Sequence, residues 1–420
     1  MAEAENRKAA GERRESPQAV PARDGPNQER RRAAGLVLMA AYPILRLAIS
    51  VLGIRRGPGV RESPHGADVS PGLPRLTVFQ AYQVGDCFMA LPSILRLSRT
   101  LSVTVLCRPD CAFLFRDAGI EALGLENPFH ARKTPKALWR SLRSAWSLRG
   151  RIGGDALDFD GDPRSALLLK VAGAERTHSY ARPFGWLFDR TFALPAEARH
   201  QAEKNMAVAA GYLLSAGRGA DLDSIPAAEA GGARRREGAD EPGPAAGPSP
   251  RDPYFLLSCW TWKEEKNWPL EYWDRVAGFF NETGLRARIL VPPDGDGGFR
   301  RFRDRWAGKL EFLAGDLPGI FQAARGAAGI ICLDNFLGHM GAYLGKPVFW
   351  INGSSDPGHV APVGTGTLIV QFEPMACRPC GHRCVNPVRT QCLLELRPER
   401  VLEELRRWLR TLPVQNGLYK

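Results

Sequence analysis

Short apolar runs alternate with amphipathic stretches along the chain from Arg75 onward. Apolar runs bounded by turn residues predict buried strands, and apolar residues that recur every three or four positions predict helices. In the first half the predicted elements are strands at Leu76–Phe79, Val103–Cys107 and Ala156–Phe159, and helices at Phe88–Leu97 and after Arg164. Such alternation is typical of a parallel sheet flanked by helices.

Residues 217–252 interrupt the alternation with Gly, Ala, Pro and a charged run, which predicts a linker or a surface insertion. The alternation then restarts, with strands at Tyr254–Ser258, Arg288–Val291, Gly329–Leu333 and Pro347–Ile351, and helices at Glu271–Thr283, Phe299–Ala307, Gly338–Leu344 and Pro398–Arg410. The last helix is a candidate to pack across the two halves. We predict an α/β protein with two domains, residues 75–216 and 253–410, whose ligands bind at the carboxyl ends of the strands.

The N-terminal part does not fit the α/β pattern. Residues 1–32 mix both charge signs with Pro, Gly and Gln, which predicts a disordered tail. Residues 33–56 are strongly apolar between flanking arginines, but Arg46 would cost roughly 2.5–3.5 kcal/mol in a membrane core and Pro43 interrupts the run. We predict a helix that lies in the membrane interface, with packing on the protein's own body as the open alternative. A cleavable signal peptide is not expected.

Composition narrows the class of protein. Hydrophobic residues make up 44% of the 420 residues and charged residues 24%, which excludes wholesale disorder and a polytopic membrane protein. The net charge of +12 favours phosphorylated ligands or an anionic membrane surface. We expect no nucleic-acid partner, because the sequence has no zinc finger, RNA-recognition signature or continuous basic helix. Nine cysteines, five of them isolated in apolar surroundings, indicate a reducing cytoplasm rather than a secreted disulfide framework.

Three loops at strand ends carry residues suited to chemistry. In the first domain, Asp86 follows a strand and falls where a helix begins. A carboxylate that faces a cleft there is a candidate general base, which would take a proton from an attacking hydroxyl. On this fragment alone, an ordinary Asp helix cap is the more common explanation.

The other two loops lie in the second domain. The loop after Ser258 offers the hydroxyl of Thr261 and the ammonium group of Lys266, which suit a diphosphate leaving group, although a solvated Lys/Glu turn fits equally well. The loop from Asp334 to His339 runs from a strand into a helix, whose first N–H groups suit a phosphate. Asp334 as a simple cap and His339 as a packed core residue are the alternatives. Together the loops are more informative, because all three would open on one cleft.

Several motifs follow one another in a specific order and spacing. They are Gly85-Asp86 followed by Ala90-Leu91-Pro92, then Asp162-Pro163-Arg164-Ser165-Ala166, Lys266-Asn267-Trp268-Pro269, Asp334 to His339, Ala342-Tyr343-Leu344-Gly345-Lys346-Pro347-Val348 and Ser355-Asp356-Pro357. In this order, over roughly residues 75–410, the chain resembles glycosyltransferase family nine, the ADP-heptose:lipopolysaccharide heptosyltransferases.

The resemblance implies a GT-B fold, in which two Rossmann-like domains face a central cleft, with the acceptor in the first domain and an ADP-sugar in the second. It also implies inverting sugar transfer without a metal. By position, Asp86 is similar to the family's catalytic base. The donor-binding positions are Thr261, Lys266, Asp334, Asn335, Gly338 and His339, with Asp294 or Asp296 at the ribose, and Arg164 lies on the acceptor side.

The same resemblance implies a lipid-linked acceptor of the lipopolysaccharide-core kind. The enzyme would work in the cytoplasm, as a peripheral protein on the inner membrane of a bacterium. The donor motif departs from the family, because Asn335 and Phe336 stand where Ser or Thr and then Gly are usual, and Phe narrows the site. The alternative is a catalytically degenerate scaffold that binds nucleotide or glycolipid in envelope assembly.

Four cysteines near the C-terminus form the pattern C-x2-C-x3-C-x7-C at Cys377, Cys380, Cys384 and Cys392. They are close enough in sequence to bind one zinc ion or an iron–sulfur cluster, but the spacing matches neither a zinc ribbon nor the bacterial ferredoxin run. We expect no cofactor in catalysis. A structural metal at this segment stays open against plain thiols or disulfides, and a redox protein is the third class to test.

Overall fold

The structure is a computed structural model that describes residues 73–128, 134–182, 185–218, 253–293, 297–364, 366–372, 375–380 and 383–412. All of these described residues belong to one compact unit, and both parallel sheets lie within it. The predicted tail at 1–32 and the apolar segment at 33–56 lie outside the described residues, as does nearly all of the predicted linker at 217–252. None of the described helices has the length and apolar content that a membrane crossing requires.

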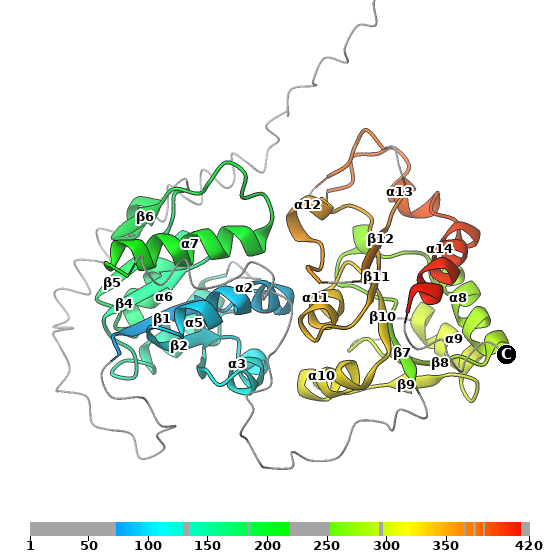
Figure 1. The fold of residues 1–420 in the computed structure, drawn as a ribbon, viewed down its shortest axis with the longest axis horizontal. Coiled ribbons are helices and arrows are strands. Elements are labelled where there is room, and N and C mark those ends of the chain that lie inside the picture. Colours follow the sequence, from blue (N-terminus) through cyan, green and yellow to red (C-terminus); the bar gives the residue numbers. More distant parts are fainter. Residues whose placement is uncertain are drawn as a thin grey trace, which may run out of the picture. The chain divides into compact units, whose positions relative to one another are not determined.

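The first domain is built on a sheet of six parallel strands (Figure 1). They are β1 (Arg75–Gln80), β2 (Ser102–Cys107), β3 (Glu121–Gly124), β4 (Asp155–Asp158), β5 (Arg176–Tyr180) and β6 (Arg190–Phe192). The strand order is β3-β2-β1-β4-β5-β6. Neighbours Val78 and Phe79 of β1 point to opposite faces, and both are fully buried. Helices therefore cover the sheet on both sides, as parallel sheets require.

The helices of this domain divide between the two faces. They are α2 (Val84–Leu97), α3 (Ala112–Asp117), α5 (Pro135–Trp146), α6 (Pro163–Ala172) and α7 (Gln201–Ser215). Helix α2 packs against α7, and α5 packs against α6. Leu91 of α2 and Val208 of α7 share one core, whereas Ala145 of α5 and Leu169 of α6 belong to another. Helix α5 therefore lies on the face of the sheet opposite α2.

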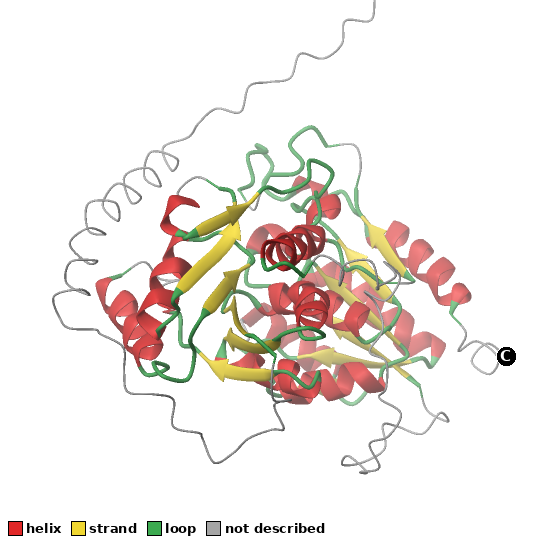
Figure 2. Cartoon of the chain, turned by 60° about the vertical axis from the view of Figure 1, so that its left-hand side comes forward, coloured by secondary structure: helices red, strands yellow, loops and turns green. Residues whose placement is uncertain are grey.

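The second domain repeats this architecture, as Figure 2 shows in red helices and yellow strands. Its strands are β7 (Tyr254–Ser258), β8 (Arg286–Leu290), β9 (Glu311–Leu313), β10 (Gly329–Leu333), β11 (Val348–Ile351) and β12 (Thr367–Val370), in the order β12-β11-β10-β7-β8-β9. Its helices are α8 (Leu270–Thr283), α9 (Gly297–Trp306), α10 (Leu317–Gly326), α11 (Phe336–Tyr343), α12 (Pro357–Val360), α13 (Gln391–Leu394) and α14 (Pro398–Thr411). All pairs in this sheet are parallel.

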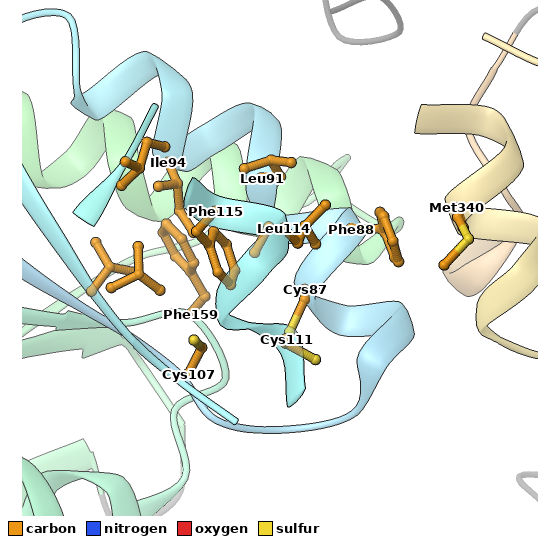
Figure 3. Close-up of a cluster of buried hydrophobic side chains, with 14 of the residues drawn as sticks. Cys87, Phe88, Leu91, Ile94, Cys107, Cys111, Leu114, Phe115, Phe159 and Met340 are labelled. Carbon is orange, nitrogen blue, oxygen red and sulfur yellow. The ribbon is translucent and has the colours of Figure 1, made fainter. Parts of the chain in front are cut away.

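One hydrophobic core joins the two domains. Phe88 of α2 stacks on Phe321 of α10 with ring centroids 6.5 Å apart, and its centroid is 5.7 Å from that of Tyr343 in α11. Phe88 points from α2 toward Met340 of α11 (Figure 3). At the rim, Arg325 donates to Asp117 across 2.9 Å. This packing holds the first turn of α2 beside α11, and the candidate site is built there.

The predicted fold class is confirmed, because two parallel sheets with flanking helices are present. The pattern missed several elements, among them β3, β5, β6, β9, β12, α5, α7 and α10. Helix α14 does not bridge the two domains, because Trp408 packs on Phe255 and Phe349 in the core of the second. The residue limits proposed for the two domains stay predictions.

Candidate functional site

Asp86 lies in the first turn of α2, directly after β1. The backbone N–H of Gln83 donates to Asp86 Oδ2 across 3.1 Å, which closes the start of the helix. Asp86 is therefore not the N-cap that the simpler explanation proposed, because Gln83 takes that position and Asp86, the third helical residue, completes a capping box with it. Its other oxygen, Oδ1, has no part in that bond. The capping contact thus leaves the group able to accept a proton.

The pKa of Asp86 is raised from 3.8 to about 6. Burial is the main cause, since surrounding protein disfavours the charged form, although the side chain still reaches solvent. The Gln83 N–H lowers the pKa, the nearby charge of Asp160 raises it, and the ammonium group of Lys266 lowers it. A carboxylate with such a pKa is a stronger base than an ordinary Asp and still ionised near neutral pH.

A second group of acids lies at the end of β4, close to Asp86. Asp158 is fully buried, accepts a hydrogen bond from the Tyr82 hydroxyl at 2.7 Å, and has its pKa raised to about 7 by burial and by Asp160. Asp160 lies 3.8 Å from Arg182. No role was predicted for these acids from the sequence, although their spacing at a strand end was a usable signal.

Lys266 and Asp334 form a largely buried ion pair in the second domain. Lys266 Nζ is 2.7 Å from Asp334 Oδ2, and the two side chains are 16% and 5% exposed. The Ser355 hydroxyl donates to the same carboxylate oxygen. Asp334 is therefore not the helix cap that the simpler explanation proposed, because Asn335 takes that position. An ammonium group has three donors, so Lys266 retains hydrogens for a phosphate.

Thr261 organises the loop that carries Lys266. Its hydroxyl donates to the Lys263 carbonyl at 2.8 Å and accepts from the Lys263 N–H at 3.1 Å. The Asn267 side chain accepts from the Thr261 N–H at 2.7 Å and donates to its carbonyl at 3.1 Å. These bonds fix the loop as a rigid support for Lys266. A direct contact between Thr261 and a diphosphate stays a prediction.

Asn335 caps α11 with a side chain that is fully engaged. Its Oδ1 accepts from the Leu337 N–H at 3.0 Å, and its Nδ2 donates to Ser258 Oγ at 2.8 Å and to the Trp260 carbonyl at 3.1 Å. The amide therefore ties the start of α11 to the end of β7. In this geometry both N–H groups of the amide bond within the protein. A contact between Asn335 and the nucleotide-sugar stays a prediction.

His339 of α11 contacts the first domain beside Asp86. A Cβ added to Gly85 would lie 3.1 Å from His339 Cδ2, so the ring packs directly on the backbone before Asp86. Burial lowers the pKa of His339 to about 4, with smaller effects from Asp334, His200 and Lys266. The imidazole is therefore neutral near neutral pH. It is a buried, neutral packing residue that lies within the electrostatic influence of Asp334 and Lys266.

Gly338 allows α11 to approach its neighbours closely. A Cβ at this position would lie 2.8 Å from Pro362 Cγ, 3.2 Å from Cys332 Sγ and 3.3 Å from Trp350 Cδ1. This close packing is enough to explain why the position is glycine. The predicted contact of Gly338 with the nucleotide-sugar stays a prediction.

Gly338→Ala is expected to lower the free energy of unfolding by about 1–3 kcal/mol, because an added methyl group overpacks this contact. Urea unfolding of both proteins measures the difference. Gly153→Ala is the control, since a Cβ there meets nothing within 4 Å. Equal stability of the Gly338 variant and the unaltered protein would show that the helix can shift at no cost.

Arg164 lies at the start of α6, with Asp162 as the cap. The guanidinium Nε is 2.8 Å and 2.9 Å from the two Asp162 carboxylate oxygens, and Nη2 also donates to this carboxylate. The positive charge is thus held at the start of α6 but is already paired with Asp162. Contact with an acceptor stays a prediction. The ribose candidates Asp294 and Asp296 lie outside the described residues.

Basic side chains gather where α7 of the first domain meets the loop around α12. Lys204 Nζ is 3.1 Å from His359 Nε2. His200 Nε2 donates to the Ala361 carbonyl at 2.9 Å. The pKa of Lys204 is lowered by burial and by Arg182, and that of His359 is lowered by burial and by Lys204. Mutual repulsion of this kind is relieved by a bound anion. No local sequence pattern predicts this cluster, because its residues lie far apart along the chain.

The cysteine segment lies beside the loop after β11, where the Cys380 N–H donates to the Ser354 carbonyl at 3.2 Å. Asn386 donates to Cys377 Sγ at 3.8 Å, and the Thr390 N–H donates to Cys384 Sγ at 3.3 Å. Within the described ranges, no three His, Cys, Asp or Glu side chains are grouped to hold a metal ion. The hypothesis of a structural metal at these four cysteines stays untested.

The two parallel sheets with flanking helices, one domain carrying Asp86 and the other the Lys266 ion pair, have the GT-B fold of the solved heptosyltransferases that the chain resembles. Residues 144–387 match glycosyltransferase family 9 (heptosyltransferase), so the chain belongs to that family.

Relatives and solved structures agree with this assignment. The chain is 24% identical to lipopolysaccharide heptosyltransferase 1 of Pseudomonas aeruginosa over 362 residues, which cover 79% of this chain and 97% of the relative. It is 24% identical to the protein of the same name from Escherichia coli K12 over 149 residues, or 35% and 44% of the two chains. The fold matches E. coli heptosyltransferase WaaC with ADP at a TM-score of 0.58 and 17% identity, covering 80% of this chain and 99% of WaaC. It matches E. coli ADP-heptose lps heptosyltransferase II at 0.59 and 18%, with the same coverage.

Family membership makes the protein an enzyme that transfers a sugar. The alternative of a catalytically degenerate scaffold is not favoured. Although Asn335 and Phe336 depart from the family motif, Lys266 still pairs with Asp334, and its charge still acts on Asp86. Assignment of individual residues to catalysis and binding remains a prediction.

Proposed function

We propose that this protein transfers a heptose, or a closely related sugar, from an ADP-sugar to a lipid-linked saccharide of the lipopolysaccharide-core kind. The observation that carries the proposal is the packing of Gly85, the residue before Asp86, on His339 of the second domain, in a member of the heptosyltransferase family. This packing brings Asp86 near enough to Lys266 for the ammonium charge to lower the pKa of Asp86. Its relatives are named as lipopolysaccharide heptosyltransferases, and one structure of similar fold contains ADP.

The second domain holds the donor in this proposal. Lys266 places a positive charge where the diphosphate leaves, with Asp334 and Ser355 fixing its position. The start of α11 adds N–H groups and a helix dipole, although the Leu337 N–H is already bound by Asn335. A fixed cation stabilises the growing charge without reorganising, so transfer is proposed to proceed without a metal ion.

The first domain supplies the base. The acceptor hydroxyl oxygen bonds to the anomeric carbon as the bond from that carbon to the diphosphate oxygen breaks. Asp86 takes the hydroxyl proton, and ADP leaves with the bonding electron pair. Because attack comes from the face opposite the leaving group, the anomeric configuration inverts. The raised pKa of Asp86 makes it a better proton acceptor than an ordinary carboxylate.

The acceptor side carries positive charge at Lys204, whose Nζ lies 3.1 Å from His359 Nε2. Arg182 adds a second positive charge and lies 3.8 Å from Asp160. The charge of Asp160 in turn raises the pKa of Asp86. We propose that phosphate or carboxylate groups of the acceptor bind at Lys204 and His359. The lipid part of the acceptor would then keep the enzyme at the cytoplasmic surface of a bacterial inner membrane.

Incubation with ADP-heptose and a lipopolysaccharide-core acceptor tests the proposal. We expect one ADP released for each sugar transferred, an inverted anomeric centre by NMR, and the same rate in the presence of EDTA. Absence of ADP release with a panel of nucleotide sugars would overturn sugar transfer by this protein. A retained configuration would overturn the base mechanism, and loss of activity in EDTA would overturn metal-independent transfer.

Lys204→Met is expected to raise the KM for the acceptor by about tenfold, since a charged hydrogen bond to an anion contributes roughly 1.5–3 kcal/mol. Affinity for ADP should not change, because Lys204 belongs to the acceptor side. Steady-state kinetics and ADP titration measure both quantities. Lys309→Met, in the second domain, is the matched control. An unchanged acceptor KM would exclude Lys204 from acceptor binding.

A further inference from the structure

Helix α5 of the first domain exposes two tryptophans. The Trp139 ring is 59% exposed and the Trp146 ring is 51% exposed. The residues that α5 buries are small: Ala137, Ser141 and Ala145. Seven positions are close to two helical turns, so the two rings lie on the same side of the helix. The helix thus packs on the sheet through small residues and presents its largest apolar groups outward.

The same surface is strongly basic. Cations at Lys136, Arg140, Arg143, Arg149 and Arg151 lie within residues 135–151, and this segment contains no Asp or Glu. Arg140 pairs with Glu126 at 3.0 Å, with both side chains more than half exposed. Exposed pairs of this kind are weak and leave the surface positive.

Each exposed ring carries a guanidinium group. The Arg143 guanidinium carbon is 5.4 Å from the Trp139 ring centroid, and that of Arg149 is 4.7 Å from the Trp146 centroid. The aromatic groups and the charges therefore form one continuous surface, rather than an apolar patch and a separate basic patch. We name the face of Lys136, Trp139, Arg140, Arg143, Trp146 and Arg149 the α5 face.

Two other charged helices show what distinguishes the α5 face. Helix α9 carries several arginines, but its Phe299 and Phe302 are buried. Helix α14 buries Trp408, and its Arg407 pairs with Glu403 and Glu404. These helices turn their aromatic residues inward, as surface helices normally do. Helix α5 turns its tryptophans outward among cations, of which Arg140 has an exposed acidic partner in Glu126.

We infer that the α5 face docks on the surface of an anionic phospholipid bilayer. Tryptophan rings favour the boundary between headgroups and acyl chains, and clustered Lys and Arg are attracted to anionic headgroups. A helix that combines both on one face is suited to lie in the plane of the interface. The positive charge of the face attracts a negatively charged partner. Its two tryptophan rings favour a partner with an apolar layer below its charged surface, which a phospholipid bilayer has.

The α5 face also has a favourable position. Helix α5 follows β3 in a parallel sheet, so it begins near the edge of the sheet where β1 ends and Asp86 lies. An enzyme docked through this face would hold its first domain against the layer that contains a lipid-linked acceptor. The inference does not depend on the proposed sugar transfer, since lipid binding requires no sugar.

Quenching of tryptophan fluorescence by vesicles of phosphatidylglycerol and brominated phosphatidylcholine tests the inference on the full chain. We expect quenching of the unaltered protein and loss of most of it in the double variant Trp139→Ser, Trp146→Ser. The single variant Trp186→Ser is the control, because Trp186 is also exposed in the first domain. Residues 1–72 contain no tryptophan, so binding through the 33–56 segment does not produce this signal. Equal quenching in the double variant and the control would overturn the inference.

A charge test uses the same vesicles. Lys136→Glu with Arg143→Glu is expected to raise the dissociation constant for anionic vesicles by about tenfold or more at low salt. Arg300→Glu with Arg301→Glu makes an equal change of charge on α9 and should alter it less than about twofold. If the α5 variant instead loses affinity for duplex DNA and keeps its vesicle binding, the face is a nucleic-acid site and the inference is wrong. Transfer to a water-soluble acceptor should be unaffected, which separates this test from that of the proposed function.

Discussion

Asp86→Asn is expected to slow sugar transfer by about two to four orders of magnitude, the usual contribution of a general base. Asn keeps the shape of the side chain but cannot take a proton from the acceptor hydroxyl. Affinity for ADP should change little, because Asp86 lies in the first domain and the proposed ADP site lies in the second. Single-turnover kinetics and ADP titration measure the two effects. Asp110→Asn, an exposed residue of the same domain, is the matched control.

The pH dependence of kcat/KM gives this prediction a second readout. The base acts as the carboxylate, so activity should fall as pH drops below the pKa of Asp86, which is about 6. The charge of Asp160 raises that pKa, so Asp160→Asn should move the acid limb to lower pH. His339 has a pKa of about 4 and does not titrate in this range.

Asp158 is a nearby acid whose pKa burial raises to about 7. Asp158→Asn is therefore measured in parallel, and the acid limb should persist in it. Full activity of the Asp86 variant, or an acid limb that disappears with Asp158, would contradict the role of Asp86 as the base.

Lys266→Met is expected to weaken ADP binding by at least about tenfold, because a charged hydrogen bond to a phosphate contributes roughly 1.5–3 kcal/mol. It should also lower the free energy of unfolding by about 3–5 kcal/mol, since the Asp334 carboxylate would be left buried without its cation. Isothermal titration with ADP and urea unfolding measure these effects separately.

A double variant separates binding from folding. Lys266→Met with Asp334→Asn removes both charges, so most of the stability should return. ADP affinity should stay low, because the cation is still missing. Lys263→Met, an exposed lysine in the same loop, is the control. Recovery of ADP binding in the double variant would mean that Lys266 supports the fold and does not contact the diphosphate.

The sequence predicted much of the fold because local patterns specify buried strands. Val78 and Phe79, or Ile330 and Ile331, belong to continuous apolar runs that fit only a strand covered on both faces. Helix α5 was missed for a physical reason. Its core-facing residues are Ala137, Ser141 and Ala145, which give little apolar periodicity, and its tryptophans face outward.

Some residues of the candidate site could likewise be predicted from the sequence, and others could not. Asp86, Lys266 and Asp334 could be selected from the sequence because each follows a strand, and the carboxyl ends of parallel strands are where ligands bind. The pairing of Lys204 with His359 joins residues 155 positions apart, and no local pattern specifies such a contact. The full engagement of the Asn335 amide by Ser258 and Trp260 likewise depends on the loop after a different strand.

The sequence by itself determined the α/β class, the family resemblance and the loops that carry the candidate chemistry, because strand burial and motif order are written along the chain. Tertiary structure alone decided the contact of Gly85 with His339, the raised pKa of Asp86 and the outward direction of Trp139 and Trp146. Burial and charge neighbours arise from segments that are distant in sequence, and the free energy of a charged or apolar group depends on them.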